Sequence, residues 1–306
     1  MPDISIWNRC NNNCIMCTNS LNFRNKVDPN LLRFETLARN IKSFGKIKES
    51  ITLSGGEPTI HPEFLNLLKW LRKQFPQTKI AIATNGRMFC YPEFTKKCFL
   101  INNLTLEIAI HGYNAQMHDD ITRTKGSFSQ TISGIHNILK YRSSFHQLEI
   151  RIILIRQNYK YLDRILNLIM NEFSSVDRIV LLFQEMEGIC GENFKKVGIT
   201  HKEVKKYLPP LFKKWKKKFK DLRLYHFPLC TIDFNLWKYS WRTLRKDEVT
   251  FLPSCNKCLY KKYCLGIHKD YLKLIGDEEF IPIRKRLFIE ARNDFYHPIL
   301  EVKEVD

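Results

Sequence analysis

The sequence predicts an α/β protein built on a parallel β-sheet, followed by a small cysteine-containing module. Two patterns predict this fold. Short runs rich in β-branched and aromatic residues alternate with amphipathic stretches over the first 188 residues. Beyond residue 188 the composition becomes more basic, and three cysteines gather within residues 255–264. We therefore expect a large sheet domain first and a smaller module after it.

Six strands and five helices are expected in alternation. The strand-like runs are residues 3–8, 50–53, 79–84, 104–110, 148–155 and 178–183, and the helical segments are 34–47, 61–74, 92–99, 128–142 and 161–173. Successive βα units predict a parallel sheet with right-handed crossovers, either doubly wound or curved into a barrel. In both arrangements the functional site lies at the carboxyl ends of the strands.

The composition excludes several classes of protein. The chain has 306 residues, of which 44% are hydrophobic, so it has ample material for a core despite a formal charge of +19. It shows neither an apolar run of membrane-spanning length nor a secretory signal, and we expect a cytoplasmic protein without membrane contact. In that reducing compartment, ten cysteines indicate metal ligation, redox chemistry or free thiols rather than disulfides.

The first cysteine group follows the first strand immediately. Cys10, Cys14 and Cys17 have C-x3-C-x2-C spacing. Three thiolates on one loop can hold three corners of a cubane iron–sulfur cluster and leave the fourth iron open for chemistry. A zinc site completed by a distant ligand and a chance grouping are the alternatives, since residues 1–60 contain no fourth cysteine and no histidine.

A glycine-rich turn follows the second strand. Gly55 and Gly56 allow close approach of the backbone to a ligand, Glu57 supplies a carboxylate acceptor, and Pro58 fixes the turn before a helix. Alone this is an ordinary βα loop, but its position one strand after the cysteine loop makes the combination specific.

Together these two motifs resemble the radical S-adenosylmethionine (radical SAM) superfamily. The resemblance implies a partial (β/α)6 TIM-like barrel and a [4Fe-4S] cluster whose open iron is chelated by SAM. It also implies that Glu57 accepts hydrogen bonds from the SAM amino group and that Gly55 and Gly56 line the methionine moiety. Met16 stands where the family often has an aromatic residue, and we expect it to pack at the same site.

Three further polar residues follow later strands. Asn85, His111 and Asn158 come after strands three, four and five, where a barrel would direct them at the SAM ribose or carboxylate. Residues 108–135 also resemble the fourth strand and following helix of radical SAM peptide maturases. The alternative for each of the three is a turn or cap residue with no ligand.

A second cysteine group lies near the C-terminus. Its members are Cys230, Cys255, Cys258 and Cys264. Four thiols can complete either a zinc site or a fully ligated [4Fe-4S] cluster, and the spacing does not distinguish the two. Behind a radical SAM barrel this segment resembles the twitch module, a shortened SPASM domain, which implies an auxiliary [4Fe-4S] cluster. Residues 185–267 also resemble HxsC-type maturases of His-Xaa-Ser peptide systems.

These resemblances imply four parts of the chain. We expect a radical SAM partial barrel at 1–188, a basic connecting segment at 189–229, a twitch-like module at 230–275 and a C-terminal tail at 276–306. Of the remaining cysteines, Cys90 and Cys98 are expected to pack, and Cys190 is a candidate substrate-contacting thiol or hydrogen donor.

A lysine-rich stretch lies in the basic segment. Residues 213–220 carry six lysines around Trp215 and Phe219. An amphipathic helix with a solvated lysine face is the plain interpretation, and a landing surface for an acidic peptide or RNA is the functional one. No RNA-binding motif accompanies it.

The expected activity is reductive cleavage of SAM to a 5′-deoxyadenosyl radical that abstracts a substrate hydrogen. A closed second cluster favours oxidative modification or crosslinking of a ribosomally made peptide, with a flavodoxin or ferredoxin as electron donor. Only nine residues precede Cys10, so we expect a leader peptide to bind the barrel, the basic segment 189–225 or a separate partner. The alternatives are a radical SAM enzyme acting on RNA or a small metabolite, and a non-enzymatic metal-stabilised nucleic-acid-binding protein.

Overall fold

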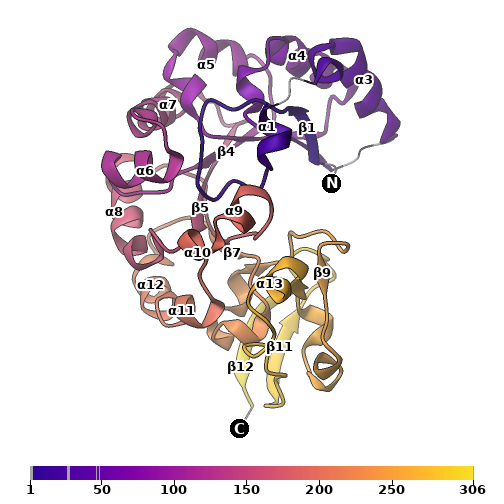
Figure 1. Ribbon diagram of the computed structural model, residues 1–306, viewed down its shortest axis with the longest axis vertical. Helices are drawn as coiled ribbons and strands as arrows, with labels where there is room; N and C mark the ends of the chain where they lie inside the picture. Colours follow the sequence, from indigo (N-terminus) through magenta and orange to yellow (C-terminus); the bar gives the residue numbers. More distant parts are fainter. Residues whose placement is uncertain (1–2, 26–27, 46, 48, 306) are drawn as a thin grey trace.

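A single parallel sheet forms the centre of the computed structural model, which describes residues 3–25, 28–45, 47 and 49–305 (Figure 1). Its eight strands pair in sequence order. They are β1 (Asp3–Trp7), β2 (Ser50–Gly55), β3 (Lys79–Thr84), β4 (Leu104–Ala109), β5 (Gln147–Leu154), β6 (Arg178–Phe183), β7 (Leu222–Tyr225) and β8 (Ser240–Trp241). Because every neighbouring pair is parallel, all the carboxyl ends of the strands lie at one edge.

Helices connect the strands and lie outside the sheet in an arc (Figure 1). They are α1 (Leu21–Asn25), α2 (Pro29–Leu32), α3 (Phe34–Ser43), α4 (Phe64–Gln74), α5 (Pro92–Cys98), α6 (Ala115–Thr122), α7 (Ser127–Tyr141), α8 (Leu162–Glu172), α9 (Gly188–Glu192), α10 (Phe194–Val197), α11 (His201–Lys205), α12 (Leu208–Trp215) and α13 (Lys269–Leu274). Short 3-10 turns add η1 (Pro58–Ile60), η2 (Arg87–Cys90), η3 (Tyr159–Tyr161), η4 (Leu229–Thr231), η5 (Phe234–Tyr239), η6 (Pro253–Lys257) and η7 (Lys261–Tyr263).

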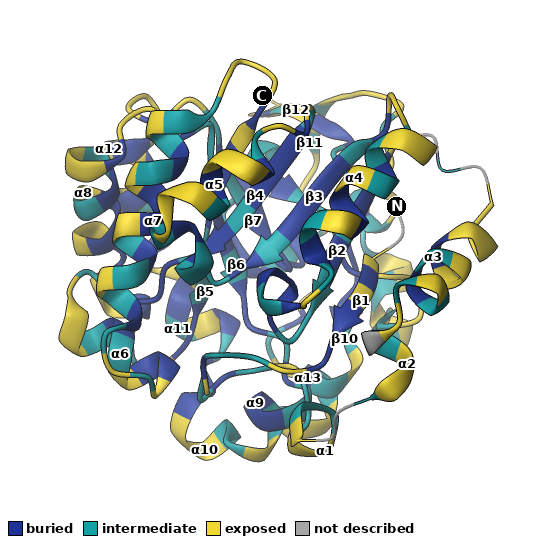
Figure 2. Ribbon diagram, turned by 90° about the horizontal axis from the view of Figure 1, so that it is seen from above, coloured by how far each residue is buried: buried dark blue, intermediate teal, exposed yellow. Residues whose placement is uncertain are grey.

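The two faces of the sheet differ in chemistry. In β5, Leu148, Ile150 and Ile152 belong to the main apolar core, which lies between the sheet and the helices (Figure 2). The alternate residues Glu149 and Arg151 point to the opposite face because successive side chains of a strand alternate. The sheet is thus buried on its helical face and polar on its concave face.

A ladder of ion pairs fills part of the concave face. Arg151 contacts Glu107 at 2.9 Å and Glu149 at 2.6 Å, and Arg178 contacts Glu149 and Asp221, each at 2.9 Å. These pairs link β4, β5, β6 and the residue before β7. Buried charges require such partners, so the ladder compensates the charges of these side chains, although Glu107 Oε2 has no hydrogen-bond partner among the described residues.

The predicted α/β fold is confirmed, with two more strands than expected. The six expected strands all occur, and β7 and β8 extend the sheet beyond residue 188. Neither strand has a clear sequence signal: β7 has four residues, one of them Arg223, and β8 has two. The two strands are the last in the sheet, and both are too short to show a clear hydrophobic period.

The C-terminal part contains two small antiparallel pairs. They are β9 (Val249–Thr250) with β10 (Ile267–His268), and β11 (Leu287–Ala291) with β12 (Ile299–Glu304). Trp241 at the end of β8 joins this part to the sheet: the Arg223 guanidinium lies 3.5 Å from its ring centroid, and His297 stacks on it at 4.4 Å. The C-terminal part is therefore packed against the last strands (Figure 1).

The lysine-rich stretch is helical only in part. Helix α12 ends at Trp215, earlier than the expected helix, and the chain continues as turns. Trp215 and Phe219 are buried and stacked 5.6 Å apart, so the expected packing of both aromatic rings on one side is confirmed. No helix in the described ranges is both long and apolar enough to cross a membrane.

Candidate functional site

The cysteine loop, residues 8–20, leaves the carboxyl end of β1 and is held by the backbone of distant segments. The Asn13 N–H donates to the Thr122 carbonyl at 2.9 Å, and the Ile15 N–H to the Ile121 carbonyl at 3.0 Å, both at the end of α6. From the other side, the Cys190 N–H in α9 donates to the Cys17 carbonyl at 2.9 Å. The loop is thus fixed between α6 and α9.

Two arginines bind the carbonyl side of the same loop. The Arg87 guanidinium donates to the Asn11 carbonyl and, at 2.8 Å, to Asn12 Oδ1, while Arg24 donates to the Asn12 carbonyl. Both guanidinium groups donate their hydrogen bonds to oxygen atoms of the loop and not to its thiols. Neither arginine was identified from the sequence, because its partner lies many residues away. The run of three asparagines beside Cys10 was the available signal.

The thiols of this loop are partly buried and lie close enough to affect one another. Burial, and then the charge of Glu57, raises the pKa of Cys10 to about 11, and burial with the two neighbouring thiols raises the pKa of Cys14 as well. The Asn12 N–H points at Cys10 Sγ at 3.3 Å, so that sulfur acts as an acceptor. A cation bound by the three sulfurs would offset this cost of ionisation, which fits a metal-ligating donor set.

The glycine-containing turn after β2 is docked on the cysteine loop. The Gly56 N–H donates to the Trp7 carbonyl at 2.6 Å, and the Glu57 N–H to the Arg9 carbonyl at 2.8 Å. A Cβ at Gly56 would lie 2.2 Å from the Arg9 oxygen, and one at Gly55 would lie 2.2 Å from the Trp7 oxygen. Both glycines are therefore required for the contact between the two motifs.

The carboxylate of Glu57 is fully buried, and its two oxygens accept different numbers of hydrogen bonds. Its Oε1 accepts three hydrogen bonds, from the N–H and hydroxyl of Thr59 and the hydroxyl of Thr84. Its Oε2 accepts one, from the Asn85 N–H at 2.7 Å. Burial raises the pKa of Glu57 despite these donors. Oε2 therefore has capacity for one further donor, such as an ammonium group. Pro58 begins the turn η1 directly after this residue.

Asn85 connects this carboxylate to the cysteine loop. Its side-chain Nδ2 donates to Asn11 Oδ1 at 2.7 Å and lies 3.9 Å from Cys10 Sγ, and its Oδ1 accepts from the Arg87 N–H. Asn85 thus joins the ends of β1, β2 and β3 at one point, and its expected contact with SAM stays a prediction.

His111 and Asn158 lie at the ends of the next two strands. The amide of Asn158 makes all its bonds to backbone: it accepts from the Ile155 N–H at 3.0 Å and donates to the carbonyls of His111 and Ile153 at 3.1 and 2.9 Å. Its expected contact with SAM stays a prediction. Its observed contacts hold the His111 backbone in place.

The His111 ring itself is buried and neutral. Burial, and then the neighbouring His118, lowers the pKa of His111 well below its ordinary value. Its Nδ1 makes no hydrogen bond within the described residues. Since buried polar atoms are normally paired, this nitrogen is an available partner for a bound molecule.

Met16 and Cys190 pack together under the cysteine loop. With Ile121, Ile155 and Val197 they form a small apolar cluster separate from the main core. The thiol of Cys190 is fully buried, and burial raises its pKa to about 12. Its expected contact with substrate stays a prediction, and its observed role is packing. Cys98 is also buried in the core, as expected.

The four C-terminal cysteines line one cavity together. This cavity lies between η4, η6 and the loop after η7, and its cysteines are Cys230, Cys255, Cys258 and Cys264. Burial, and then the three other thiols, raises the pKa of Cys230 to about 12. In the part of the chain that the structure describes, no three His, Cys, Asp or Glu side chains converge closely enough to hold a single metal ion. The thiols surround a shared space instead.

A carboxyl–imidazole pair that sequence reasoning missed lies at the same edge of the sheet. Glu185 follows β6, His226 follows β7, and Glu185 Oε1 lies 3.3 Å from His226 Nδ1. Burial raises the pKa of Glu185 to about 7 and lowers that of His226 to about 3, so the two do not form a full ion pair at neutral pH. His226 has φ +69°, an unusual backbone conformation for a residue other than glycine.

Comparison with known proteins was made by sequence and by structure. The chain is similar to the GTP 3',8-cyclase of Petrotoga mobilis, with 30% identity over 138 residues that cover 45% of this chain and 42% of the relative. It is similar to mycofactocin maturase MftC of Mycobacterium tuberculosis, with 26% identity over 155 residues that cover 50% and 37%. It is also similar to the GTP 3',8-cyclase of Clostridium perfringens, with 24% identity over 302 residues that cover 94% and 88%. The first two matches span about two fifths of those relatives.

Two solved structures share the fold. Native anSMEcpe with bound AdoMet superposes with a TM-score of 0.58 at 15% identity, covering 92% of this chain and 83% of that one. Streptococcus suis SuiB bound to precursor peptide SuiA superposes with a TM-score of 0.55 at 15% identity, covering 70% and 46%. Residues 4–169 match the family described as the Radical SAM superfamily. Because this match covers more than half of the sequence, the chain belongs to the radical SAM superfamily.

Proposed function

We propose that this protein is a radical SAM enzyme that oxidatively modifies or crosslinks a ribosomally made peptide. Membership of the superfamily implies a [4Fe-4S] cluster and SAM. When bound, these groups supply a 5′-deoxyadenosyl radical that removes a hydrogen atom from the substrate. The protein contributes ligands, orientation and exclusion of water.

Cys10, Cys14 and Cys17 are the proposed ligands of the SAM-binding cluster. The single observation that supports this assignment best is the shared hydrogen-bond network of the cysteine loop, Glu57 and Asn85. That network places a buried carboxylate oxygen with spare capacity beside a loop of three thiols. A cationic amino group and a cluster with one open iron would complement both.

Other residues at this edge are proposed to orient SAM. Glu57 Oε2 would accept from its amino group, and His111 Nδ1 is placed as a partner for a polar atom. Gly55 and Gly56 keep the turn close to the cysteine loop. Met16 packs in the small apolar cluster beside the loop, and Asn158 fixes the His111 backbone by donating to its carbonyl.

The second cysteine set is proposed to hold an auxiliary [4Fe-4S] cluster in a twitch-like module at 230–275. Four thiols can ligate all four irons, which leaves no iron open for substrate. Such a cluster could accept the one electron that the substrate radical loses when its new bond forms, and this favours oxidative modification over a redox-neutral change. The HxsC-type assignment remains a prediction, as does a flavodoxin or ferredoxin donor.

Anaerobic reconstitution tests the proposal directly. We expect about eight irons per chain and release of 5′-deoxyadenosine when dithionite and SAM are added. Replacing all three of Cys10, Cys14 and Cys17 by alanine should abolish that release and remove about half of the iron. Bound zinc without SAM cleavage would instead support a non-enzymatic, metal-stabilised nucleic-acid-binding protein.

A small-molecule substrate is the second candidate. It is supported by the end-to-end similarity to a GTP 3',8-cyclase, which covers 94% of this chain. Incubation of the reconstituted enzyme with GTP, followed by mass spectrometry, separates the two candidates. A short neighbouring reading frame with repeated residue motifs would favour the peptide, whereas a cyclised nucleotide would favour the metabolite. RNA modification has only the lysine-rich stretch in its favour.

A further inference from the structure

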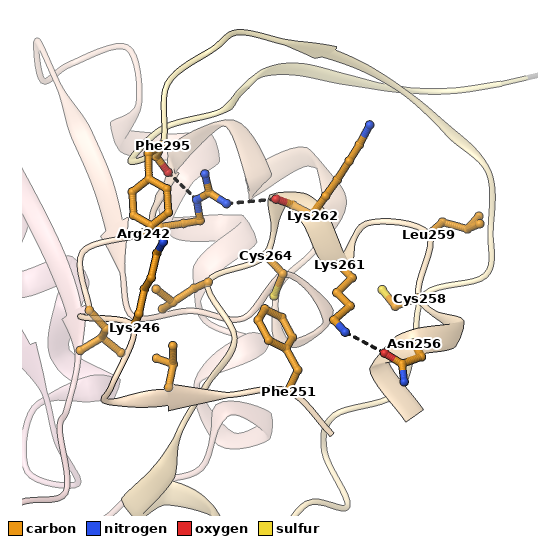
Figure 3. A pocket seen from close by; sticks show the side chains of 13 residues that line it. Arg242, Lys246, Phe251, Asn256, Cys258, Leu259, Lys261, Lys262, Cys264 and Phe295 are labelled. Carbon is orange, nitrogen blue, oxygen red and sulfur yellow. Dashed lines mark hydrogen bonds between the residues drawn. The ribbon is translucent and has the colours of Figure 1, made fainter. Parts of the chain in front are cut away.

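A solvent-connected cavity of about 740 Å³ lies against the second cysteine set (Figure 3). Cys258 and Cys264 form part of its wall, and its other walls come from the segment 242–251, the segment 256–262 and Phe295 in the turn between β11 and β12. This volume is in the range of cavities that bind small molecules or short peptide segments.

Among the described residues, four cations line this cavity and no carboxylate does. Arg242 donates to the carbonyls of Phe295 and Lys262, at 2.5 and 3.0 Å, and Lys261 donates to Asn256 Oδ1 at 2.7 Å. These partners are neutral oxygens. The charge of Asp294, which pairs with Arg292 at 3.0 Å, also acts on Arg242 from beyond ion-pair distance. Within the described ranges, none of Arg242, Lys246, Lys261 and Lys262 lies at ion-pair distance from an acidic side chain. Burial also lowers the pKa of Arg242 below its usual value.

The lysine-rich stretch at 213–220 differs in this respect. Lys214 contacts Asp163 at 2.8 Å and Lys220 contacts Asp177 at 3.6 Å. The Trp215 indole N–H also donates to Asp163 at 2.8 Å. Part of that stretch is therefore neutralised by the protein itself. Two of the six lysines of that stretch are thus paired with an acidic side chain, whereas none of the four cavity cations is, within the described ranges.

The cavity also offers apolar surface. Phe251, Leu259 and Phe295 line it and are substantially exposed. Arg242 and Lys246 lie over the Phe295 ring at 4.6 and 5.5 Å, and Lys261 lies over Phe251 at 5.2 Å. Cations beside exposed rings suit a ligand that alternates anionic and apolar groups, which is the chemistry of an acidic, amphipathic peptide segment.

We propose that this cavity is the docking site for an acidic segment of the peptide substrate. The inference rests on the proposed peptide-modifying function. It adds where on the protein the peptide would be recognised and which charge the recognised segment would carry. A segment anchored there lies beside the second cysteine set. A docking site at this position places leader-peptide binding in the C-terminal module rather than in the lysine-rich stretch.

The cations could alternatively serve the auxiliary cluster itself. A [4Fe-4S] cluster with four thiolates carries negative charge, and Cys264 lies close enough to Arg242 for a thiolate there to raise the pKa of the guanidinium. In that case neutralising the lysines would change the cluster's reduction potential and leave peptide affinity untouched. The test therefore needs both readouts.

Fluorescence anisotropy on the reconstituted holoenzyme tests the proposal. The probe is a fluorescein-labelled peptide that alternates glutamate and leucine, with glutamine–leucine and lysine–leucine peptides as comparisons. We expect the glutamate probe to bind most tightly and to weaken as NaCl rises from about 0.05 to about 0.5 M. The triple variant Lys246→Gln, Lys261→Gln, Lys262→Gln should lose roughly tenfold or more in affinity. Arg242 is retained because its guanidinium holds two carbonyls.

A matched variant removes the same charge from the lysine-rich stretch: Lys213→Gln, Lys217→Gln, Lys218→Gln. It should bind the probe within about twofold of wild type. Equal losses in both triple variants, no preference for the glutamate probe, or an altered potential with unchanged affinity would each overturn the proposal. Tighter binding of a labelled RNA that depends on the same lysines would overturn it in favour of RNA. Release of 5′-deoxyadenosine, measured separately, reports on the proposed function alone.

Discussion

The backbone N–H of Asn85 donates a 2.7 Å hydrogen bond to Oε2 of Glu57, and this bond joins the end of β3 to the turn after β2. The other oxygen of Glu57 is occupied by three donors from Thr59 and Thr84. Both oxygens therefore face backbone N–H groups, which can donate but cannot accept. The carboxylate is matched to its surroundings in a way that an amide would not be.

Glu57→Gln should therefore destabilise the protein. Whichever way the amide turns, its NH2 faces the N–H of Asn85 or of Thr59, and a buried pair of donors costs about 1–3 kcal/mol. Urea denaturation measures the loss, and equilibrium dialysis with SAM should show weaker binding. Glu93→Gln is the control, since it removes the same charge at an exposed site. Equal stability of the two variants would count against the assigned network.

Gly56→Ala should separate the turn from the cysteine loop. The added Cβ would lie 2.2 Å from the Arg9 carbonyl oxygen, which belongs to the backbone and has little freedom to move. We expect a loss of about 1–3 kcal/mol in stability and a fall in iron content after reconstitution. The control is Gly126→Ala, where φ is +82° but the space is open. Normal iron in both variants would contradict the predicted coupling of the two motifs.

Asn158→Asp should be more damaging than Asn158→Ala. Alanine removes three hydrogen bonds at a fully buried site, for about 3 kcal/mol. Aspartate replaces the donating Nδ2 by a carboxylate oxygen. This oxygen faces the carbonyl oxygens of His111 and Ile153 and is repelled by them. Chemical denaturation of the two variants gives the order, and Asn167→Asp on the exposed face of α8 serves as reference. An aspartate variant as stable as wild type would refute the assigned orientation of the amide.

The double variant Cys255→Ala, Cys258→Ala should lose about four irons per chain and keep the rest. Cleavage of SAM should continue without product, because the two cysteine sets lie in separate parts of the structure. Iron analysis and 5′-deoxyadenosine release check both statements. Cys90→Ala, outside both sets, should match wild type. Loss of SAM cleavage equal to the loss of product would contradict the separate roles.

Glu185 should make stability depend on pH. Folding raises its pKa from 4.5 to about 7, mainly by burial, so the folded protein retains a proton that the unfolded chain releases between those pH values. The resulting stability is fully present below about pH 4.5 and is lost as pH rises to about 7, by roughly 3 kcal/mol in total. Glu185→Gln should remove this fall in stability. The contribution of His226, whose pKa is lowered from 6.5 to about 3 by burial, has the opposite sign between those pH values and remains in both proteins. Melting temperatures at pH 5.5 and pH 8 measure it, and parallel slopes for both proteins would contradict the raised pKa.

Much of the fold was predictable because its signals are local. The strands from β1 to β6 are apolar runs with clear flanking helices, and each was expected close to its observed place. Strands β7 and β8 were missed because four and two residues carry no measurable period. Their pairing is decided by the sheet edge left open by β6, which is a property of the assembled fold.

The site was predictable in its residue types and less so in its contacts. The cysteine loop and the turn after β2 were recognisable because their spacing is local. Arg87, which binds Asn11 and Asn12, was not, because a long-range pair leaves no pattern in a single sequence. Asn158 illustrates the converse: an asparagine after a strand suits a ligand contact and a backbone brace equally well, and only the partners distinguish them.

The contacts of the cysteine loop also order the steps by which the enzyme is made. The loop is synthesised first, yet its shape depends on Arg87, on the end of α6 and on Cys190 in α9. During translation these partners emerge one after another, and the last appears only when β6 is complete. A ribosome-bound fragment that ends before α9 would present three cysteines without their final support. Iron loading at the proposed ligands Cys10, Cys14 and Cys17 is therefore expected to follow synthesis of residues up to α9, well after the three cysteines themselves have been made.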